Sequence, residues 1–213
     1  MNWIGIALVL VYTTTVSKLV NGHVFKLGSC PNVEVQEDFN LDKFLGQWYV
    51  IQRFQTNSQC LKQNVTEENG VYYLSQNRQF FDTDFIRINR GSTSKGKISI
   101  PDKNSPSKMI VDFPLNLFGK VNYWVMMTDY DNYAAIWSCR RMLLGHFQHA
   151  EILSRSPTLD KVILNKIRGR FETYGVDEHQ FSVIDQEDCQ DQKDRNGVEI
   201  SLLVDNIFDR FRI

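Results

Sequence analysis

Val121 to Cys139 reads VNYWVMMTDYDNYAAIWSC, and this stretch decides the fold class. Two strongly β-forming segments, Val121–Thr128 and Tyr133–Cys139, flank the tetrapeptide Asp129–Asn132, whose residue types favour a tight hairpin connection. In both segments apolar side chains fall on both faces of the strand, so both faces must be covered by other parts of the protein. In an antiparallel chain this pattern indicates a barrel wall with an apolar interior and a packed patch outside.

Shorter β-forming segments lie on both sides of this hairpin. We expect strands at Trp48–Phe54, Gly70–Phe80, Phe85–Asn89, Lys97–Ile100, Lys108–Phe113, His149–Ser154 and Gln180–Ile184. Turns are expected at Asn89–Gly91 and Asp102–Pro106, and His23–Asn40 is expected to be irregular. About eight strands closed into a barrel leave an interior that side chains fill or that holds one small ligand.

Two helices are expected beside these strands. One helical turn is predicted within Asp38–Leu45, with Asn40 as its N-cap. Ser156 followed by Pro157 predicts the start of a longer helix, and Gly175 predicts its end. Between them, apolar residues recur at helical spacing: Leu159, Val162, Ile163, Ile167, Phe171 and Tyr174. We expect this amphipathic helix to lie against the outside of the barrel.

The composition and the first residues limit the class of protein. The chain has 213 residues, with 24 Lys and Arg against 25 Asp and Glu, so nothing recruits nucleic acid by bulk electrostatics. The apolar run Ile4–Val16 is shorter than the roughly 20 residues of a membrane span. It predicts a signal peptide over residues 1–22, cleaved before His23 or, alternatively, nearer Ser17, and therefore a secreted protein. We expect one domain over residues 23–190 and a C-terminal extension over 191–213.

The four cysteines suit an oxidising compartment. Cys30, Cys60, Cys139 and Cys189 are even in number, so they should pair, and no two are close enough for a Cys-x-x-Cys metal or redox site. Four cysteines allow three connectivities, and their spacing does not choose among them. No metal site is expected. Asn64 begins the only N-glycosylation sequon and is expected to carry a glycan.

Three short motifs carry a resemblance to a known family. They are Gly46 and Trp48 in Gly-x-Trp, Thr128, Asp129 and Tyr130 in Thr-Asp-Tyr, and a lone arginine at Arg155. In this order and at these separations, they resemble the three conserved regions of kernel lipocalins. From about His23 to Cys189, the chain is most similar to the apolipoprotein D and insect Lazarillo branch of that family.

The resemblance implies an all-β fold with one flanking helix, namely an eight-stranded antiparallel up-and-down lipocalin barrel. It implies a carrier of a small hydrophobic ligand that needs no cofactor, catalyses nothing, and acts in lipid handling and protection against oxidative stress. It implies that Trp48 closes one end of the barrel, with the Arg155 guanidinium stacked on its indole. It also implies the disulfides Cys30–Cys139 and Cys60–Cys189.

Lipocalin strand parity predicts which side chains line the ligand site. They are Val65, Tyr72, Leu74, Gln76, Tyr123, Val125, Ala134, Ile136, His149, Glu151 and Leu153. Most are apolar or aromatic, as a pocket for a lipid, sterol, retinoid or tetrapyrrole requires, although the same side chains could pack on each other and leave no cavity. Trp124 and Trp137 are expected beside this pocket.

His149 and Glu151 are two residues apart on one strand, so they share a face. A buried carboxylate must be paired. Glu151 therefore either pairs with His149, reaches solvent, or meets a polar group of the ligand, unless the parity is wrong and both side chains lie outside.

An apolar loop and two other functions complete the expectations. Leu115, Leu117 and Phe118 form an apolar cluster that either contacts a membrane or lipoprotein or folds over its own barrel. The alternative functions are a lipocalin-type isomerase, which would need a free thiolate, and a barrel that serves only as the scaffold of an extracellular signal.

Overall fold

The computed structural model describes residues 23–56, 58–80, 90–114, 119–187 and 189. Its elements in chain order are β1 (Val24–Leu27), α2 (Leu41–Phe44), β2 (Gly46–Phe54), β3 (Gln59–Glu68), β4 (Val71–Phe80), β5 (Arg90–Ser99), β6 (Lys108–Asp112), β7 (Val121–Thr128), β8 (Tyr133–Arg141), β9 (Gly145–Ser154), α3 (Lys161–Glu172), the 3₁₀ helix η1 (Glu178–Gln180) and β10 (Phe181–Val183).

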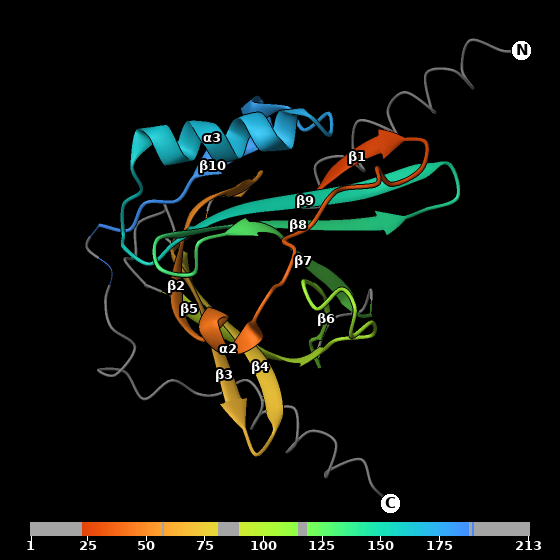
Figure 1. Cartoon of the computed structure of the whole chain (residues 1–213). Coiled ribbons are helices and arrows are strands. Elements are labelled where there is room, and N and C mark those ends of the chain that lie inside the picture. Colours follow the sequence, from red (N-terminus) through yellow and green to blue (C-terminus); the bar gives the residue numbers. More distant parts are fainter. Residues whose placement is uncertain (1–22, 57, 81–89, 115–118, 188, 190–213) are drawn as a thin grey trace, which may run out of the picture.

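Strands β2 to β9 form a closed antiparallel barrel. They follow one another in chain order around the sheet, and β9 pairs back onto β2 (Figure 1). The two other strands lie at the ends of the sheet order, β1 against β9 and β10 against β2. The predicted eight-stranded up-and-down barrel is therefore confirmed, and α3 is the one long helix of the described chain.

The barrel has two distinct ends. At the closed end, α2 leads into β2 at Gly46, and β9 finishes at Ser154. At the open end, β8 turns into β9 through Met142–Leu144. Asn40 caps α2 by accepting a hydrogen bond from the Lys43 amide (3.1 Å), which confirms the predicted short helix.

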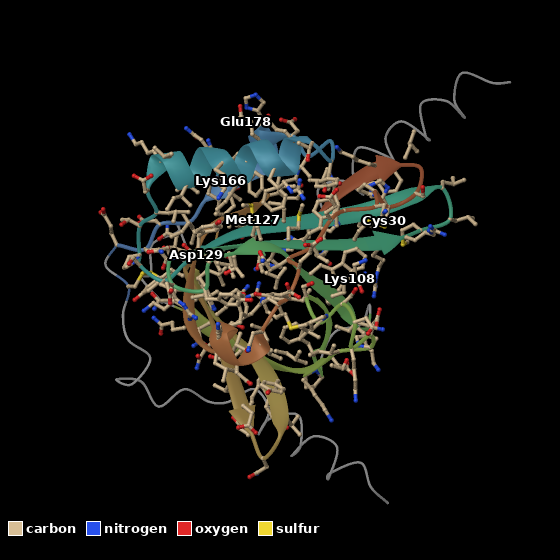
Figure 2. All side chains as sticks on the ribbon, in the orientation of Figure 1. Cys30, Lys108, Met127, Asp129, Lys166 and Glu178 are labelled. Atoms are coloured by element: carbon tan, nitrogen blue, oxygen red, sulfur yellow. A yellow bond between two sulfur atoms is a disulfide. The ribbon has the colours of Figure 1, made fainter. Side chains whose placement is uncertain are left out.

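Two apolar clusters hold the fold together. The first lies inside the barrel and includes Trp48, Val50, Leu74, Val125 and Leu153. The second lies between the barrel and α3 and includes Phe54, Trp137, Ile152, Ile167 and Phe171. Met127, labelled in Figure 2, packs against this second cluster beneath the helix. The predicted position of α3 against the outside of the barrel is confirmed.

Two strands were not predicted, and one predicted turn is wrong. β1 lies in the segment expected to be irregular, and β3 is rich in polar residues that hide its alternation. Arg90 and Gly91 belong to β5 rather than to a turn, because they pair with Phe80 and Gln79. The predicted strand Phe85–Asn89 lies outside the described residues. The turn at Asp102–Pro106 is confirmed by a hydrogen bond from the Ser105 amide to the Asp102 carbonyl oxygen (3.1 Å).

Helix α3 begins later than the Ser-Pro pair predicts. Its N-cap is Asp160, whose side chain accepts hydrogen bonds from the amides of Val162 (2.8 Å) and Ile163 (3.3 Å). The Ser156 amide instead donates to the Ser154 hydroxyl (3.1 Å), so this residue lies in the preceding bend. Asp160 caps these two amides of the first turn, so the helix begins about one turn after Ser156.

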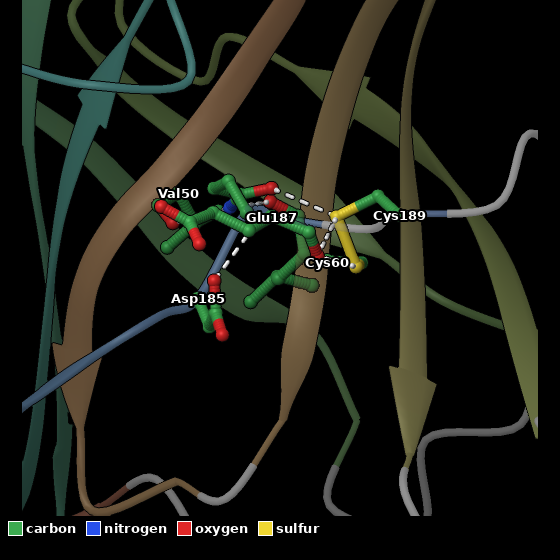
Figure 3. The surroundings of a disulfide bond; sticks show 7 residues. Val50, Cys60, Asp185, Glu187 and Cys189 are labelled. Carbon is green, nitrogen blue, oxygen red and sulfur yellow. Dashed lines mark hydrogen bonds between the residues drawn. A yellow bond between two sulfur atoms is a disulfide. The ribbon is translucent and has the colours of Figure 1, made fainter.

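Both disulfides implied by the family resemblance are present. Cys30 is bonded to Cys139, 109 residues away, and Cys60 is bonded to Cys189, 129 residues away. The first ties the N-terminal segment to β8, and the second ties the chain after β10 to β3 (Figure 3).

The segment before Cys189 joins β2 and β3 where these two strands no longer pair with each other. The register pairs of β2 with β3 end at Tyr49 and Lys62, short of the open end. Beyond them runs a segment that we call the C-terminal strap, Ile184–Glu187 (Figure 3). Its amide at Ile184 donates to β2 at Ile51 (2.9 Å), and its carbonyl at Asp185 accepts from β3 at Cys60 (2.8 Å). The Gln186 amide group donates to the carbonyl oxygens of Val50 (2.8 Å) and Leu61 (3.0 Å), so the strap joins the two strands.

No helix among the described residues has the length and apolar character needed to cross a membrane.

Candidate ligand-binding site

The closed end is sealed by Trp48 and Arg155. The Trp48 ring has no exposed area, and the Arg155 guanidinium carbon lies 3.6 Å from its centroid. Arg155 also donates hydrogen bonds to four carbonyl oxygens, from Lys43 (3.4 Å), Leu45 (2.9 Å), Gln47 (2.9 Å) and Tyr130 (2.9 Å). The predicted stack is confirmed, and one cation thus holds α2, the start of β2 and the β7–β8 turn together.

Gly46 makes this arrangement possible. Its φ is +93°, a conformation that favours glycine, and a Cβ there would lie 3.4 Å from an Arg155 guanidinium nitrogen. The turn from α2 into β2 therefore brings the Leu45 and Gln47 carbonyls up to Arg155.

Thr128, Asp129 and Tyr130 build the adjoining turn. The Thr128 hydroxyl donates to the Tyr133 carbonyl (2.7 Å), and the Asp129 carboxylate accepts from the Asn132 amide (2.8 Å) and the Tyr133 amide (3.0 Å). The Tyr130 hydroxyl accepts from the Asn40 amide (3.0 Å). Burial raises the pKa of Asp129, but these hydrogen bonds outweigh it and lower the pKa. The motif is structural and forms part of the closed end.

The cross-strand register orders the predicted ligand residues along the interior. Val65 lies opposite Leu74, Val125 opposite Ile136, and Ala134 opposite Leu153. These apolar side chains are buried in the interior cluster towards the closed end. Gln76, one step beyond Leu74 on the same face, is only partly buried.

Burial falls towards the open end along the inner faces of β7 and β9. Leu74, Val125 and Leu153 have no exposed area. Two residues nearer the open end on the same faces, Val121 of β7 and Phe147 of β9, are partly buried. Inner-face side chains at the open ends of β7 and β9 are thus partly exposed, whereas those of the closed half are buried against one another.

A layer of polar side chains separates the two halves. Glu151 is 2% exposed, and its carboxylate lies 3.2 Å from Arg53 Nε and 3.0 Å from His149 Nε2. Gln63 donates to the second carboxylate oxygen (2.5 Å) and accepts from the Tyr123 hydroxyl (2.7 Å). The expected pairing of Glu151 with His149 is present, and Arg53 and Gln63 join it.

This layer fixes the charge of Glu151. Burial alone would raise the pKa of its carboxyl, but the charge of Arg53, the hydrogen bond and charge of His149, and the Gln63 hydrogen bond lower it to about 2. Burial, together with the Glu151 charge, raises the pKa of the Tyr123 phenol well above its usual value. Glu151 is therefore an anion, and Tyr123 is a neutral hydrogen-bond donor.

Arg53 and Gln63 were not among the predicted site residues. Arg53 follows Val50 and Gln52, where the β2–β9 register shifts, so this irregularity turns it to the face of Glu151. Sequence alternation alone places Arg53 on the wrong face. Gln63 alternates with Leu61 and Val65, so its inward position could have been predicted if β3 had been recognised.

Three other expectations concern residues around the site. Tyr72 lies at the closed end, where its hydroxyl donates to Asp42 of α2 (2.7 Å), and this hydrogen bond raises the pKa of the Tyr72 phenol. Trp137 packs with Phe171 of α3 in the outer cluster, and Trp124, its register partner, shares that side. The expectation that these two tryptophans lie beside the pocket is therefore wrong, because residues opposite each other in a sheet project from the same face.

Two sequence features have other positions. Asn64 lies on β3 between the inward Gln63 and Val65, so it faces outwards. Leu115, Leu117 and Phe118 lie outside the described residues. Within the described ranges, no group of three or more His, Cys, Asp or Glu side chains could hold a metal ion.

Comparison with known proteins identifies the family. The model of the lipocalin and cytosolic fatty-acid binding protein family matches residues 45–188, which run from just before β2 to just past the strap. The chain belongs to this family. The Trp48–Arg155 seal and the closed eight-stranded barrel are thus the frame of a lipocalin-family protein.

Curated relatives of this lipocalin-family chain cover most of its length. Apolipoprotein D of Cavia porcellus is 32% identical over 176 residues, which span 80% of this chain and 89% of that protein. The Lazarillo protein of Schistocerca americana is 22% identical over 195 residues, which span 84% of this chain and 86% of that protein. These relatives confirm the resemblance to the apolipoprotein D and Lazarillo branch.

Solved structures show the same fold. Insecticyanin from the tobacco hornworm Manduca sexta has a TM-score of 0.63 at 24% identity, covering 77% of this lipocalin-family chain and 89% of that chain. Lobster apocrustacyanin A1 has a TM-score of 0.63 at 20% identity, covering 79% and 93%.

Proposed function

We propose that this protein is a secreted carrier that binds and transports a small hydrophobic ligand, such as a lipid, fatty acid, sterol, retinoid or bilin, inside its barrel. The observation that carries the proposal is the change in side-chain burial along the barrel interior. The interior is sealed at Trp48, and some of its side chains are partly exposed at the open end. Such a one-mouthed, mostly apolar interior with few polar groups is typical of small-ligand sites. Membership of the family supports the same function. We also keep the proposal that the protein acts in lipid handling and protection against oxidative stress.

The ligand contacts in this proposal are the predicted inner-face residues. We assign the apolar contacts to Val65, Leu74, Val125, Ala134, Ile136 and Leu153, and the polar contacts to Gln76, Tyr123, His149 and Glu151. Tyr72 is left out because it faces Asp42 at the closed end. The closed half is filled by its own side chains, so a ligand that passes the polar layer must displace some of them.

The same filled half favours one competing function. A barrel whose interior stays packed would serve as the scaffold of an extracellular signal, as eight-stranded barrels do with side chains alone. The isomerase alternative has less support, since it needs a thiolate and all four cysteine sulfurs are bonded.

Secretion, glycosylation and loop contact belong to the proposal as well. Disulfides persist in oxidising compartments, which supports export directed by residues 1–22. The outward position of Asn64 suits a glycan. We retain the proposal that Leu115, Leu117 and Phe118 contact a membrane or lipoprotein.

The test of carriage begins with what the secreted protein holds. The full chain is purified from a secreting host without detergent, and its organic extract is analysed by mass spectrometry. The stripped protein is then titrated with a fatty acid, a retinoid, a sterol and biliverdin. Recovery of a lipid, or saturable binding of one of the four, supports the carrier. Failure of both would favour the scaffold alternative over the carrier.

A reporter pair locates the bound molecule. Val121→Trp puts an indole on the inner face near the open end, whereas Asn122→Trp puts one on the outer face of the same strand. Binding of a brominated fatty acid, whose bromine atoms quench an indole only at contact distance, should quench the first variant much more than the second. Equal quenching would show that the ligand binds outside the barrel.

A further inference from the structure

Most of the exposed large apolar side chains of the described chain gather at one corner. Leu143 is 96% exposed, Leu144 is 77% exposed and Leu27 is 80% exposed, and Phe25 and Met142 are exposed beside them. We call these five residues the apolar tip. The other such residues, Val162 on α3 and Val183 on β10, lie on separate elements. Contiguous exposed apolar surface marks a contact site, whereas single exposed residues do not.

The apolar tip is one continuous structure. Leu27 lies opposite Gly145, and the Gly28 amide donates to the Leu144 carbonyl (3.4 Å), so β1 runs directly beside the β8–β9 turn (Figure 1). Phe25 extends the tip along β9, with its ring 5.3 Å from that of Phe147. Backbone hydrogen bonds therefore hold β1 and the β8–β9 turn together at this corner.

Among the described residues, the charged side chains that adjoin the tip along the chain are cationic. The segments that form or adjoin this corner are residues 23–28, 119–122 and 139–147, and they contain Lys26, Lys120, Arg140 and Arg141 but no Asp or Glu. Lys26 is directed to the Gly175 carbonyl beyond α3, away from the tip. Arg140 donates to the Lys120 carbonyl (3.1 Å), which holds two of the cationic residues side by side, and Arg141 is exposed next to Met142.

We propose that the apolar tip is a docking surface for a lipid surface that carries anionic headgroups. Exposed leucines enter the apolar layer while nearby arginines and lysines stay at headgroup level and attract negative charge. A second copy of the chain fits the tip poorly. A two-fold contact would bring Lys120, Arg140 and Arg141 of both copies together, with no carboxylate from these segments to balance them.

Docking also orients the barrel. Gly145, Phe147, His149 and Glu151 alternate along one face of β9, which runs from the tip into the interior. A docked tip therefore places the open end of the barrel against the lipid surface. The inference goes beyond ligand carriage, and docking does not require that carriage be correct.

The test measures binding of the full chain to vesicles. The wild type should co-sediment more strongly with phosphatidylcholine vesicles that contain phosphatidylserine than with phosphatidylcholine alone. Leu143→Ser/Leu144→Ser should weaken binding to the anionic vesicles at least about tenfold, because each leucine buries an apolar side chain. Val162→Ser/Val183→Ser removes equally exposed apolar residues elsewhere and should bind like the wild type.

Two more variants separate the contributions. Arg140→Gln/Arg141→Gln should abolish the preference for phosphatidylserine while keeping the weaker binding to phosphatidylcholine. Leu143→Trp should be quenched by brominated lipid tails when docked, which reports contact without removing a leucine. Leu115→Ser/Leu117→Ser/Phe118→Ser tests the proposed loop contact separately. Thermal melts of all variants identify any that fail to fold.

The outcomes decide the inference. Equal binding of wild type and Leu143→Ser/Leu144→Ser, or absence of wild-type binding to anionic vesicles, would overturn it. A wild-type dimer that becomes a monomer in the Leu143→Ser/Leu144→Ser variant would assign the tip to a second copy instead. Vesicle binding by ligand-free protein supports docking even when every ligand titration fails.

Discussion

At the scale of single residues, two partly buried cations organise the barrel by different means. Arg155 is held by four carbonyl oxygens and one indole, so its fork geometry is used almost completely. Arg53 is held by the Glu151 carboxylate in the interior. The first arrangement closes the barrel, and the second creates a charged layer across it.

Removing the indole at the closed end should be severely destabilising. Trp48→Ala deletes a fully buried ring and the surface on which Arg155 stacks, so we expect a loss of about 3–5 kcal/mol in the free energy of unfolding. Urea denaturation measures the loss. Trp124→Ala, at a partly buried outer position, is the control and should cost less. A Trp48→Ala protein that melts within about 2 °C of the wild type would contradict the assignment.

The polar layer should make stability depend on acid pH. The pKa of Glu151 is about 2 in the folded protein against an ordinary 4.5, so the unfolded chain binds the proton more readily. Its contribution is complete above pH 4.5 and is lost as the pH falls through about 2, which amounts to about 3 kcal/mol. Urea unfolding between these pH values should show this slope in the wild type and a smaller slope in Glu151→Gln.

The matched control uses a carboxylate on the surface. Glu68 pairs with Lys95 (2.7 Å), and both side chains are exposed, so Glu68→Gln should cost less than about 1 kcal/mol and keep the wild-type slope. At neutral pH, Glu151→Gln should cost about 3–5 kcal/mol, because it leaves Arg53 unpaired in the interior. Parallel pH profiles for wild type and Glu151→Gln would refute the proposed role of Glu151 as a buried anion.

At the scale of elements, the strands with strong β-formers and the amphipathic helix could be predicted from the sequence, whereas the polar strands could not. β7 and β8 show apolar residues on both faces, and α3 shows them at helical spacing. β3 presents Gln63 to the interior, where Glu151 and Tyr123 satisfy its amide. A polar residue inside the barrel is stable only because of partners from distant strands, and local alternation does not show them.

The candidate site was predictable to the same extent. The apolar inner positions follow from strand parity, which holds as long as the pairing is regular. The inward position of Arg53 could not be predicted, because the irregularity at Val50–Gln52 changes which face of β2 the following residues occupy. That shift depends on pairing with β9. Trp124 and Trp137 were assigned to the pocket from their strands, but the faces they occupy are covered from outside.

Mutations at the start of α3 can show whether Asp160 or Ser156 is the N-cap of the helix. Asp160→Ala removes the acceptor for two amides and should cost about 1 kcal/mol in the free energy of unfolding. Ser156→Ala should change stability by less than about 0.5 kcal/mol, because its amide rather than its hydroxyl is engaged. Thermal and urea unfolding of the two variants measure the difference. A larger loss in Ser156→Ala would show that the helix begins at the Ser-Pro pair.

At the scale of the whole molecule, the disulfides connect parts that are far apart in sequence. Each spans more than 100 residues, and in the chain-entropy model each stabilises the fold by up to about 4–5 kcal/mol. One fixes the segment that leads into the barrel, and the other fixes the strap that joins β2 to β3.

The two disulfides should differ in whether they protect the strap from local opening. Cys60→Ser/Cys189→Ser should destabilise the protein and raise hydrogen exchange at the Ile184 amide, which bonds to Ile51 across the strap. Cys30→Ser/Cys139→Ser should also destabilise it but leave exchange at Ile184 low under native conditions. Hydrogen exchange with mass spectrometry distinguishes the two. Unchanged exchange at Ile184 in the first variant would show that the strap holds without its disulfide.

The C-terminal strap also sets the order in which the protein is made. Cys60 emerges from the ribosome 129 residues before the cysteine that pairs with it. At a synthesis rate of about 5–20 residues per second, the open halves of β2 and β3 wait several seconds or longer for the segment that joins them. During that interval the wall has an uncovered seam, which is a place where a chaperone or oxidoreductase gains access and where a strand from another chain pairs wrongly. The barrel is therefore finished only after translation has passed residue 189.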